Sequence, residues 1–332
     1  DMIGIRTQLD KVQGPNEVEI RDEEGVPKKI KTLTTGEEWK NPELLGVLFD
    51  FDRLAVRIKP GRKEDLIKEI DAILKSRSLP PGHAAKIKGR LQFLSCSLFG
   101  RIGRALMRPI SERQYENAKK KGSGPRWNST SERYHEINDA IEDSLRGWKK
   151  IIANGRPRPI APRRPGPADA IFFSDGSSEE GELPKVGAVL MAWWRSCPVA
   201  FSKRIPKDRM DRWLPRSNQI ALVEIFAAVM TISHFGPELQ GKRVIGLIDS
   251  ECALDALIKG NSKFEDVIGL IRVFWELIAE FQIEIYLDRV STDANPSDGM
   301  SRDGEQEARD IGWLIEEAKF PEVIYRSSKN KD

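Results

Sequence analysis

The sequence predicts an α/β protein: a mixed five-stranded sheet with flanking helices in the C-terminal half, preceded by a mostly helical domain. Apolar runs of strand length support the sheet, and they lie at 170–174, 186–194, 198–202, 244–248 and 283–287. Apolar residues at helical spacing support the flanking helices, which are expected at 217–234, 251–259, 264–281 and 304–318. The same spacing recurs between residues 62 and 148, after two short strands at 44–51 and 54–58, and predicts the helical domain.

Changes in composition divide the chain into five parts. We expect an N-terminal arm at 1–41, a hairpin-and-helix domain at 42–150, a linker at 151–168, the α/β domain at 169–320 and a tail at 321–332. The linker stands out because residues 154–167 contain five prolines and four arginines. Proline at this density prevents a packed helix or a central strand, so a stiff and extended connector is expected.

The net charge of +3 hides an uneven distribution. Residues 101–170 carry 16 basic against 8 acidic side chains, whereas residues 171–332 carry 20 against 27. A basic middle beside an acidic C-terminal domain fits a nucleic acid that is held by one part and acted on by the other. A solvated linker next to an ordinary acidic surface is the alternative interpretation.

The sequence gives little sign of a membrane or secreted destination. No apolar run approaches membrane-spanning length, and the first residues lack a secretory pattern. Three cysteines that lie far apart fit a reducing compartment. We therefore expect an intracellular protein without a membrane partner, with nucleus, cytoplasm and organelle left open. Because the chain starts at Asp1 and not at Met, we also expect a processed or trimmed product.

Four acidic residues occupy places that suit a shared site. Asp175 and Asp249 each close an apolar strand, Glu224 lies inside an apolar helical pattern, and Asp298 follows an Asn-Pro helix-start signal. Like charges resist ionising together in a low-dielectric site, so a cluster of four carboxylates implies a cation. Oxygen donors without His or Cys favour Mg²⁺ or Mn²⁺. Two such ions about 4 Å apart activate a water and stabilise the leaving oxygen of a phosphodiester.

Two sets of arginines could hold a phosphate backbone. The candidates are Arg101, Arg104 and Arg108, which share one face of a helix, and the linker residues Arg156, Arg158, Arg163 and Arg164. Guanidinium groups contact phosphates in a bidentate manner. A solvated or internally paired face for the first set, and a merely solubilising role for the second, are the alternatives. Trp194 and Trp213 could stack on bases, although tryptophan more often packs in a core.

A series of motifs runs in order through residues 42–112. The motifs are Leu44-Leu45-Gly46, Arg57, Leu66, Leu91-Gln92-Phe93, Leu98-Phe99-Gly100-Arg101 and Arg108-Pro109-Ile110. Their order resembles the thumb-like segment after the palm in retrotransposon reverse transcriptases, in which a ribonuclease H domain is the next module. Polymerases of this family need a Tyr-x-Asp-Asp type motif for their metals, but this chain has no adjacent Asp-Asp. We therefore expect no polymerase activity by itself, unless a separate chain supplies the palm.

The C-terminal motifs carry a sharper resemblance. They are Phe173-Ser174-Asp175-Gly176-Ser177, Glu224 in its helix, Ile248-Asp249-Ser250, and Asn295-Pro296-Ser297-Asp298-Gly299-Met300-Ser301-Arg302. This set, with the element order, resembles retroelement ribonuclease H domains, with Ser297 where Ala is usual. The resemblance implies that Asp175, Glu224, Asp249 and Asp298 are the catalytic metal ligands. It also implies that strands one and four are neighbours.

Two features that are often found in ribonucleases H are missing from the chain. Only 48 residues separate Asp249 from Asp298, which leaves no room for the basic helix-loop that cellular ribonucleases H often carry. A histidine is also often found in the loop before the fourth acidic residue, but none of the three histidines of this chain lies in the loop before Asp298. Substrate binding would then fall to the arginines and tryptophans named above.

Two functions follow as hypotheses. The first is a ribonuclease H of retroelement type, an endonuclease that uses Mg²⁺ or Mn²⁺ to hydrolyse the RNA strand of an RNA:DNA hybrid. The second is a domesticated retroelement fragment that acts as a non-catalytic RNA-binding subunit of a ribonucleoprotein, such as an organellar (mitochondrial) ribosome. The missing palm beside an intact thumb-like segment motivates the second hypothesis.

Overall fold

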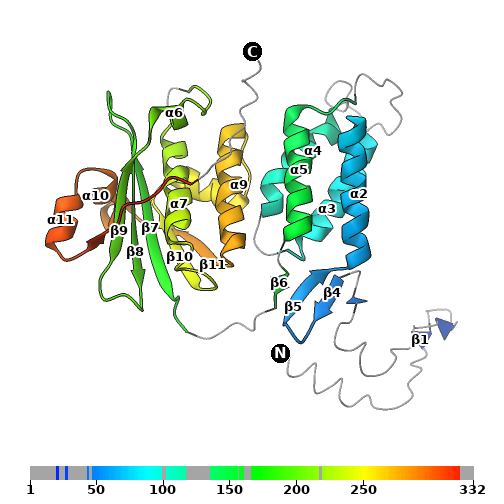
Figure 1. Cartoon of the computed structure of the whole chain (residues 1–332), viewed down its shortest axis with the longest axis horizontal. Helices are drawn as coiled ribbons and strands as arrows, with labels where there is room; N and C mark the ends of the chain where they lie inside the picture. Colours follow the sequence, from blue (N-terminus) through cyan, green and yellow to red (C-terminus); the bar gives the residue numbers. More distant parts are fainter. Residues whose placement is uncertain are drawn as a thin grey trace.

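The computed structural model contains two lobes, an N-terminal helical lobe and a C-terminal lobe around a sheet (Figure 1). The structure describes residues 20–21, 27–28, 43–44, 47–98, 102–116, 135–155, 157–160, 166–216 and 219–321. Within the predicted N-terminal arm, β1 (Ile20–Arg21) and β2 (Pro27–Lys28) form an antiparallel pair. In the described part of the chain, no helix combines the length and the apolar character that crossing a membrane requires.

The N-terminal lobe begins with the predicted hairpin. β3 (Glu43–Leu44), β4 (Val47–Asp50), β5 (Ala55–Ile58) and β6 (Arg158–Pro159) form an antiparallel sheet in that order. Asp50 stabilises the β4–β5 turn, because its buried carboxylate accepts the backbone N–H of Arg53 at 3.0 Å and pairs with Arg57 at 3.2 Å.

Among the described residues of this lobe, four helices follow the hairpin, as the helical spacing predicts. They are α2 (Pro60–Ser76), α3 (Pro81–Ser95), α4 (Ile102–Tyr115) and α5 (Asp139–Asn154). Proline stands in the first turn of both α2 and α3, where its missing N–H costs nothing. Gly103 lets α4 approach α5 closely, since a β-carbon there would overlap the Trp148 ring. The buried faces of these helices join in one apolar core.

The proline-rich linker is partly integrated into the N-terminal lobe. Helix α5 continues to Asn154, beyond the boundary expected at residue 150. β6 then pairs with β5, with Pro159 opposite Ala55. β6 is the edge strand of its sheet, a position that tolerates proline because no neighbour needs the missing donor.

The C-terminal lobe is an α/β domain with a mixed sheet, as predicted. The strands are β7 (Ala170–Ser177), β8 (Lys185–Ala192), β9 (Val199–Arg204), β10 (Arg243–Ile248), β11 (Glu284–Arg289) and β12 (Leu314–Ile315), and their order is β11-β10-β7-β8-β9-β12. β7, β8 and β9 form the predicted antiparallel meander, and β10 lies parallel to β7 and β11. The expected adjacency of the first and fourth strands is therefore present, which is the ribonuclease H-like arrangement.

Helices cover both faces of this sheet (Figure 1). They are α6 (Lys207–Met210), α7 (Ile220–Phe235), α8 (Glu251–Lys259), α9 (Glu265–Glu280), the short 3₁₀ helix η2 (Thr292–Ala294), α10 (Ser297–Ser301) and α11 (Glu305–Asp310). α7 is apolar nearly all round because it lies between β7 and β8 on one side and α9 on the other. α10 contacts β7, β8 and β9 from the opposite face.

The last predicted helix, at 304–318, is wrong in its second half. α11 ends at Asp310, and Gly312 then adopts a left-handed conformation with φ +87. Leu314 follows in the edge strand β12, where its N–H donates to Pro198 O at 3.0 Å. Pairing with β9 thus replaces the last turns of the expected helix and adds a sixth strand to the predicted five. Ile311, which the helical pattern places on the apolar side of that helix, is 68% exposed.

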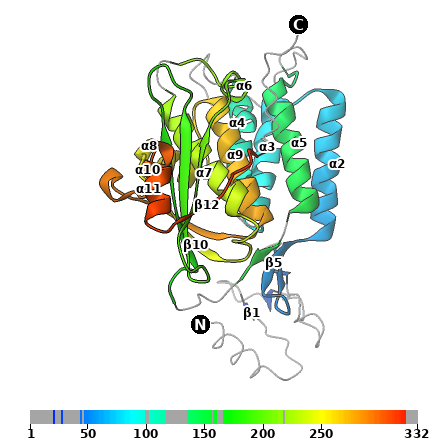
Figure 2. The same cartoon turned by 60° about the vertical axis from the view of Figure 1, so that its left-hand side comes forward.

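The two lobes touch through α4 and α9, which lie side by side in Figure 2 and are in contact. Arg108 on α4 donates a hydrogen bond to the carbonyl oxygen of Ser262, just before α9. It also pairs with Glu112 on its own helix at 2.8 Å. One member of the predicted basic face is therefore part of the contact between lobes.

Candidate metal centre

Asp175 lies near the end of β7, in the centre of the sheet, where it stands opposite Gly187 of β8. Strand β7 lies between β8 and β10, and Asp175 is only 4% exposed. The apolar residues before it form the buried strand, and the small residues after it leave space for a helix to approach.

Glu224 approaches Asp175 from α7. A β-carbon on Gly176 would stand 2.8 Å from the carbonyl carbon of Val223, so the absence of a side chain at Gly176 sets the close spacing of β7 and α7. This close approach of α7 places Glu224, which is 6% exposed, next to the end of β7 that carries Asp175.

Asp249 directly follows β10, which lies parallel to β7 with Ile248 opposite Ser174. The residues that follow Ile248 and Ser174 are Asp249 and Asp175, so the register places these two carboxylates side by side. Ser250 begins α8 as its N-cap, accepting the N–H of Ala253 at 3.4 Å, which turns the chain away from the sheet.

The three carboxylates converge. One oxygen from each of Asp175, Glu224 and Asp249 lies within 4.8 Å of the others. We call this set the carboxylate triad. Its members come from three elements that are far apart in the sequence, and oxygen is the only donor type in it.

Two members of the triad, Asp175 and Glu224, hold protons tightly when no cation is bound. Burial raises the pKa of Asp175 to about 6, and the charges of Asp249 and Asp298 act in the same direction against a hydrogen bond from Ser301. Burial also raises the pKa of Glu224 to about 9, with further contributions from Asp175 and Asp249. A divalent cation would reverse both effects by favouring the ionised forms.

Two oxygens of the triad have unsatisfied bonding capacity. Within the described residues, Glu224 Oε2 and Asp249 Oδ1 are buried and have no hydrogen-bond partner. Buried polar atoms are nearly always paired, so orphaned oxygens that converge with a third carboxylate call for an explanation. Hard oxygen donors of this kind fit Mg²⁺ or Mn²⁺, and the triad would hold such an ion.

The fourth predicted ligand, Asp298, lies outside the triad. It sits on α10, half-buried, and its Oδ1 accepts the guanidinium of Arg302 at 3.2 Å. Its charge still raises the pKa of both Asp175 and Glu224, which shows that it lies nearby. Three of the four predicted carboxylates are thus brought together, and a ligand role for Asp298 stays a prediction.

Ser301 is a residue of this site to which the motif analysis assigned no role. Its side chain is fully buried, and its hydroxyl donates to Asp175 Oδ2. Ser301 belongs to the Ser-Arg pair that closes the Asn-Pro motif, so the sequence indicates that it lies near the site. Its contact with Asp175 could not be predicted, because the two residues are 126 positions apart in the sequence.

The predicted phosphate-binding arginines differ in their surroundings. Arg104 is exposed on α4, whereas Arg108 makes the lobe contact described above. Arg158 on β6 is exposed and donates to Cys96 O at 3.4 Å. The remaining candidates, Arg101, Arg156, Arg163 and Arg164, lie outside the described residues.

The two candidate stacking residues are used within the fold. Trp194 donates to Glu238 at 2.6 Å and lies under Lys242, while Trp213 is buried against Phe226. The neighbouring Trp193 is instead 73% exposed, and sequence reasoning did not single it out.

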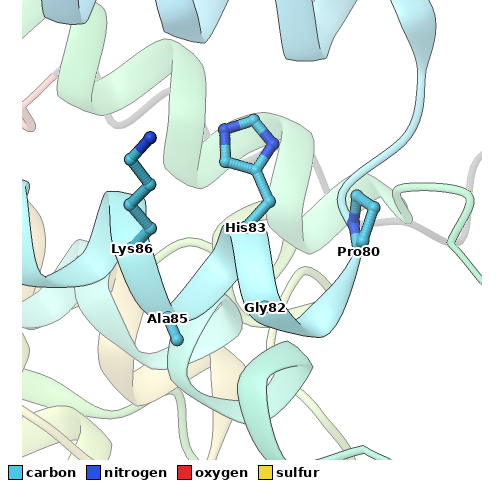
Figure 3. Close-up of a pocket in the computed structure, with 5 residues that line it drawn as sticks. All are labelled: Pro80, Gly82, His83, Ala85 and Lys86. Carbon is cyan, nitrogen blue, oxygen red and sulfur yellow. The ribbon is translucent and has the colours of Figure 1, made fainter. Parts of the chain in front are cut away.

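A surface hollow of about 670 Å³ lies at the start of α3, away from the triad (Figure 3). Pro80, Gly82, His83, Ala85 and Lys86 line it. His83 is held by Glu69, with 2.8 Å between His83 Nε2 and the carboxylate. The hollow contains none of the predicted catalytic carboxylates.

Comparison with known proteins gives no family assignment. No family model matches the chain, and no curated protein matches it. Among solved structures, the chain is similar to the N-terminal ribonuclease H domain of a Mycobacterium tuberculosis protein fused to maltose-binding protein, with 16% identity and a TM-score of 0.32 over 44% of this chain and 99% of that one. It is also similar to ribonuclease H1 of Halobacterium salinarum, with 14% identity and a TM-score of 0.32 over 42% and 98%. At this TM-score neither similarity bears on activity.

Proposed function

We propose that this protein is a metal-dependent ribonuclease H of retroelement type, which hydrolyses the RNA strand of an RNA:DNA hybrid and has no polymerase activity by itself. The observation that carries the proposal is the convergence of Asp175, Glu224 and Asp249 within 4.8 Å, with orphaned oxygens on two of them. A buried all-oxygen cluster at the end of a central strand is a costly arrangement that a divalent cation makes favourable.

The residues of the chain have separable tasks in this proposal. Bound divalent ions would supply an activated water and would stabilise the leaving oxygen of the phosphodiester. Asp175, Glu224 and Asp249 would hold the cations, and Asp175 and Glu224 would release their protons as they do so. The buried apolar residues of α7 around Glu224 keep bulk water away from the side of the triad that faces this helix.

Substrate binding would involve basic side chains of the N-terminal lobe. Arg104 is exposed on α4 and has the planar donors that suit phosphate contacts. The retroelement type is supported by the Asn-Pro-Ser-Asp motif at 295–298 and by the order of motifs before the linker. A polymerase chain or a larger ribonucleoprotein would be a partner that supplies what this chain lacks.

Cleavage of a labelled RNA:DNA hybrid tests the proposal. The full chain should cleave the RNA strand with Mg²⁺ or Mn²⁺ and not with a chelator, and Asp175→Asn or Asp249→Asn should lower the rate at least about 100-fold. Asp255→Asn is the matched control, because Asp255 is an exposed acid on α8 that pairs only locally with Lys259. Absence of cleavage by micromolar wild-type protein with both metals would contradict the proposal.

A second candidate is a non-catalytic RNA-binding subunit of a ribonucleoprotein. The observation that favours it is the pairing of Asp298 with Arg302, which gives the fourth predicted ligand an internal counter-charge. This function predicts a co-purifying RNA, no nuclease activity, and unchanged RNA binding in Asp175→Asn. The charge reversal Arg104→Glu should then reduce RNA binding while Asp175→Asn does not.

A further inference from the structure

The segment that carries Ser301 lies directly against the strand that carries Asp175. Ser301 is fully buried, and its Oγ lies within hydrogen-bonding distance of Asp175 Oδ2 and, at 3.0 Å, of the Asp298 carbonyl oxygen. A serine hydroxyl has a single proton, so it donates to one acceptor at a time. A carboxylate is the stronger acceptor, since charge-assisted hydrogen bonds are shorter and stronger than neutral ones.

The close approach of Ser301 depends on Gly187 of β8. Gly187 stands opposite Asp175 in the sheet, and a β-carbon there would overlap the backbone at Met300 and Ser301. Ser177 adds a second link, because its hydroxyl donates to the carbonyl oxygen of Ser301. The end of α10 is therefore held against β7 and β8 at the level of the triad, which gives the Ser301 hydroxyl a fixed position.

We propose that Ser301 is a positioning residue for Asp175, which fixes the rotation of this carboxylate so that it meets Glu224 and Asp249 at a shared cation. The inference rests on the metal centre proposed above and adds a residue to it. Asp175 has no other side-chain hydrogen bond recorded among the described residues. Without the hydroxyl, the carboxylate would be free to rotate about its Cβ–Cγ bond, and metal binding would first have to order it.

Binding of Mn²⁺ alone to the full chain, measured by calorimetry, tests this role without relying on activity. Ser301→Ala should weaken the affinity about 10- to 100-fold, the range typical of residues that orient metal ligands. Ser301→Cys keeps the shape with a weaker donor and should give an intermediate loss. Ser177→Ala removes the supporting link to the Ser301 carbonyl oxygen but keeps the hydroxyl that reaches Asp175, so it should weaken the affinity less than Ser301→Ala does.

A hydrolysis assay adds a readout that distinguishes positioning from simple destabilisation. Saturating Mn²⁺ should restore most of the kcat of Ser301→Ala, whereas it should not restore Asp175→Asn. If the folded Ser301 variants bind Mn²⁺ as tightly as wild type, or if Ser177→Ala loses as much affinity as Ser301→Ala, the positioning role is overturned. If wild type itself binds no Mn²⁺, the metal centre fails, and this outcome is distinct because it appears before any variant is compared.

Discussion

Gly176 on β7 and Val223 on α7 approach so closely that a β-carbon on the glycine would stand 2.8 Å from the valine carbonyl carbon. This spacing brings Glu224, the residue after Val223, above Asp175, the residue before Gly176. The distance between a strand and a helix thus sets the distance between two carboxylates.

Gly176→Ala should therefore disturb the triad and the packing together. The added methyl group meets backbone atoms, which cannot rotate away, so we expect a loss of about 1–3 kcal/mol in the free energy of unfolding and weaker Mn²⁺ binding. Urea unfolding and calorimetry measure the two effects. Gly89→Ala is the control: it is an exposed position in α3 with nothing within 4 Å of the added carbon, so it should stabilise by about 0.5–1 kcal/mol. Equal effects of the two substitutions would contradict this account.

The raised pKa values of Asp175 and Glu224 predict a pH dependence with a definite sign. The pKa of Asp175 is raised from 3.8 to about 6 and that of Glu224 from 4.5 to about 9, so the folded state binds protons more tightly than the unfolded chain. Their contribution to stability is fully present below the unfolded values near pH 4. It is lost as the pH rises through the folded values, that is, between pH 4 and 9.

Glu224→Gln isolates this contribution. In the presence of a chelator at pH 7, the variant should be more stable than wild type by on the order of 2 kcal/mol, because it no longer has a carboxyl group that must stay protonated. The difference should shrink towards pH 4. Melting temperatures of both proteins from pH 4 to 9 provide the measurement, and a variant that is less stable than wild type at pH 7 would show that the carboxylate is stabilised by something other than protons.

Much of this site could be predicted from the sequence, since its elements have local signals. Asp175 and Asp249 each close an apolar strand, and the resemblance to ribonuclease H domains implies that these strands are neighbours, as the structure shows. The segment after Asp310 could not be predicted, because Leu314 and Ile315 fit a helical stripe, and only pairing with β9 makes them a strand. The direction of the Asp298 side chain, towards Arg302, is likewise not encoded in motif order. Ser301 has a partner that only the tertiary structure supplies.

Metal binding should stabilise the protein more at high pH than at low pH, because a cation competes with the protons on Asp175 and Glu224. With free Mn²⁺ held at 100 times the dissociation constant that applies at pH 9, we expect about 2.7 kcal/mol of added stability at that pH and less at pH 6. Thermal unfolding with Mn²⁺ or with a chelator, at pH 6 and pH 9, measures the effect. Asp175→Asn should reduce it strongly, whereas Asp255→Asn should not. A shift of the same size at both pH values would argue against binding at the triad.

Arg104 and Arg108 lie one helical turn apart on α4, but we expect their replacement to affect different properties: nucleic-acid binding for Arg104 and stability for Arg108. Arg104 is exposed, so Arg104→Ala should leave stability within about 0.5 kcal/mol of wild type while weakening RNA or hybrid binding and reducing its salt dependence. Arg108 bonds to Ser262 O across the lobe contact, so Arg108→Ala should cost about 1–2 kcal/mol of stability. Urea unfolding and binding at two salt concentrations separate these effects. If Arg104→Ala binds nucleic acid as tightly as wild type does, Arg104 does not contact the phosphates. If Arg108→Ala is as stable as wild type, the α4–α9 contact does not depend on the hydrogen bond to Ser262.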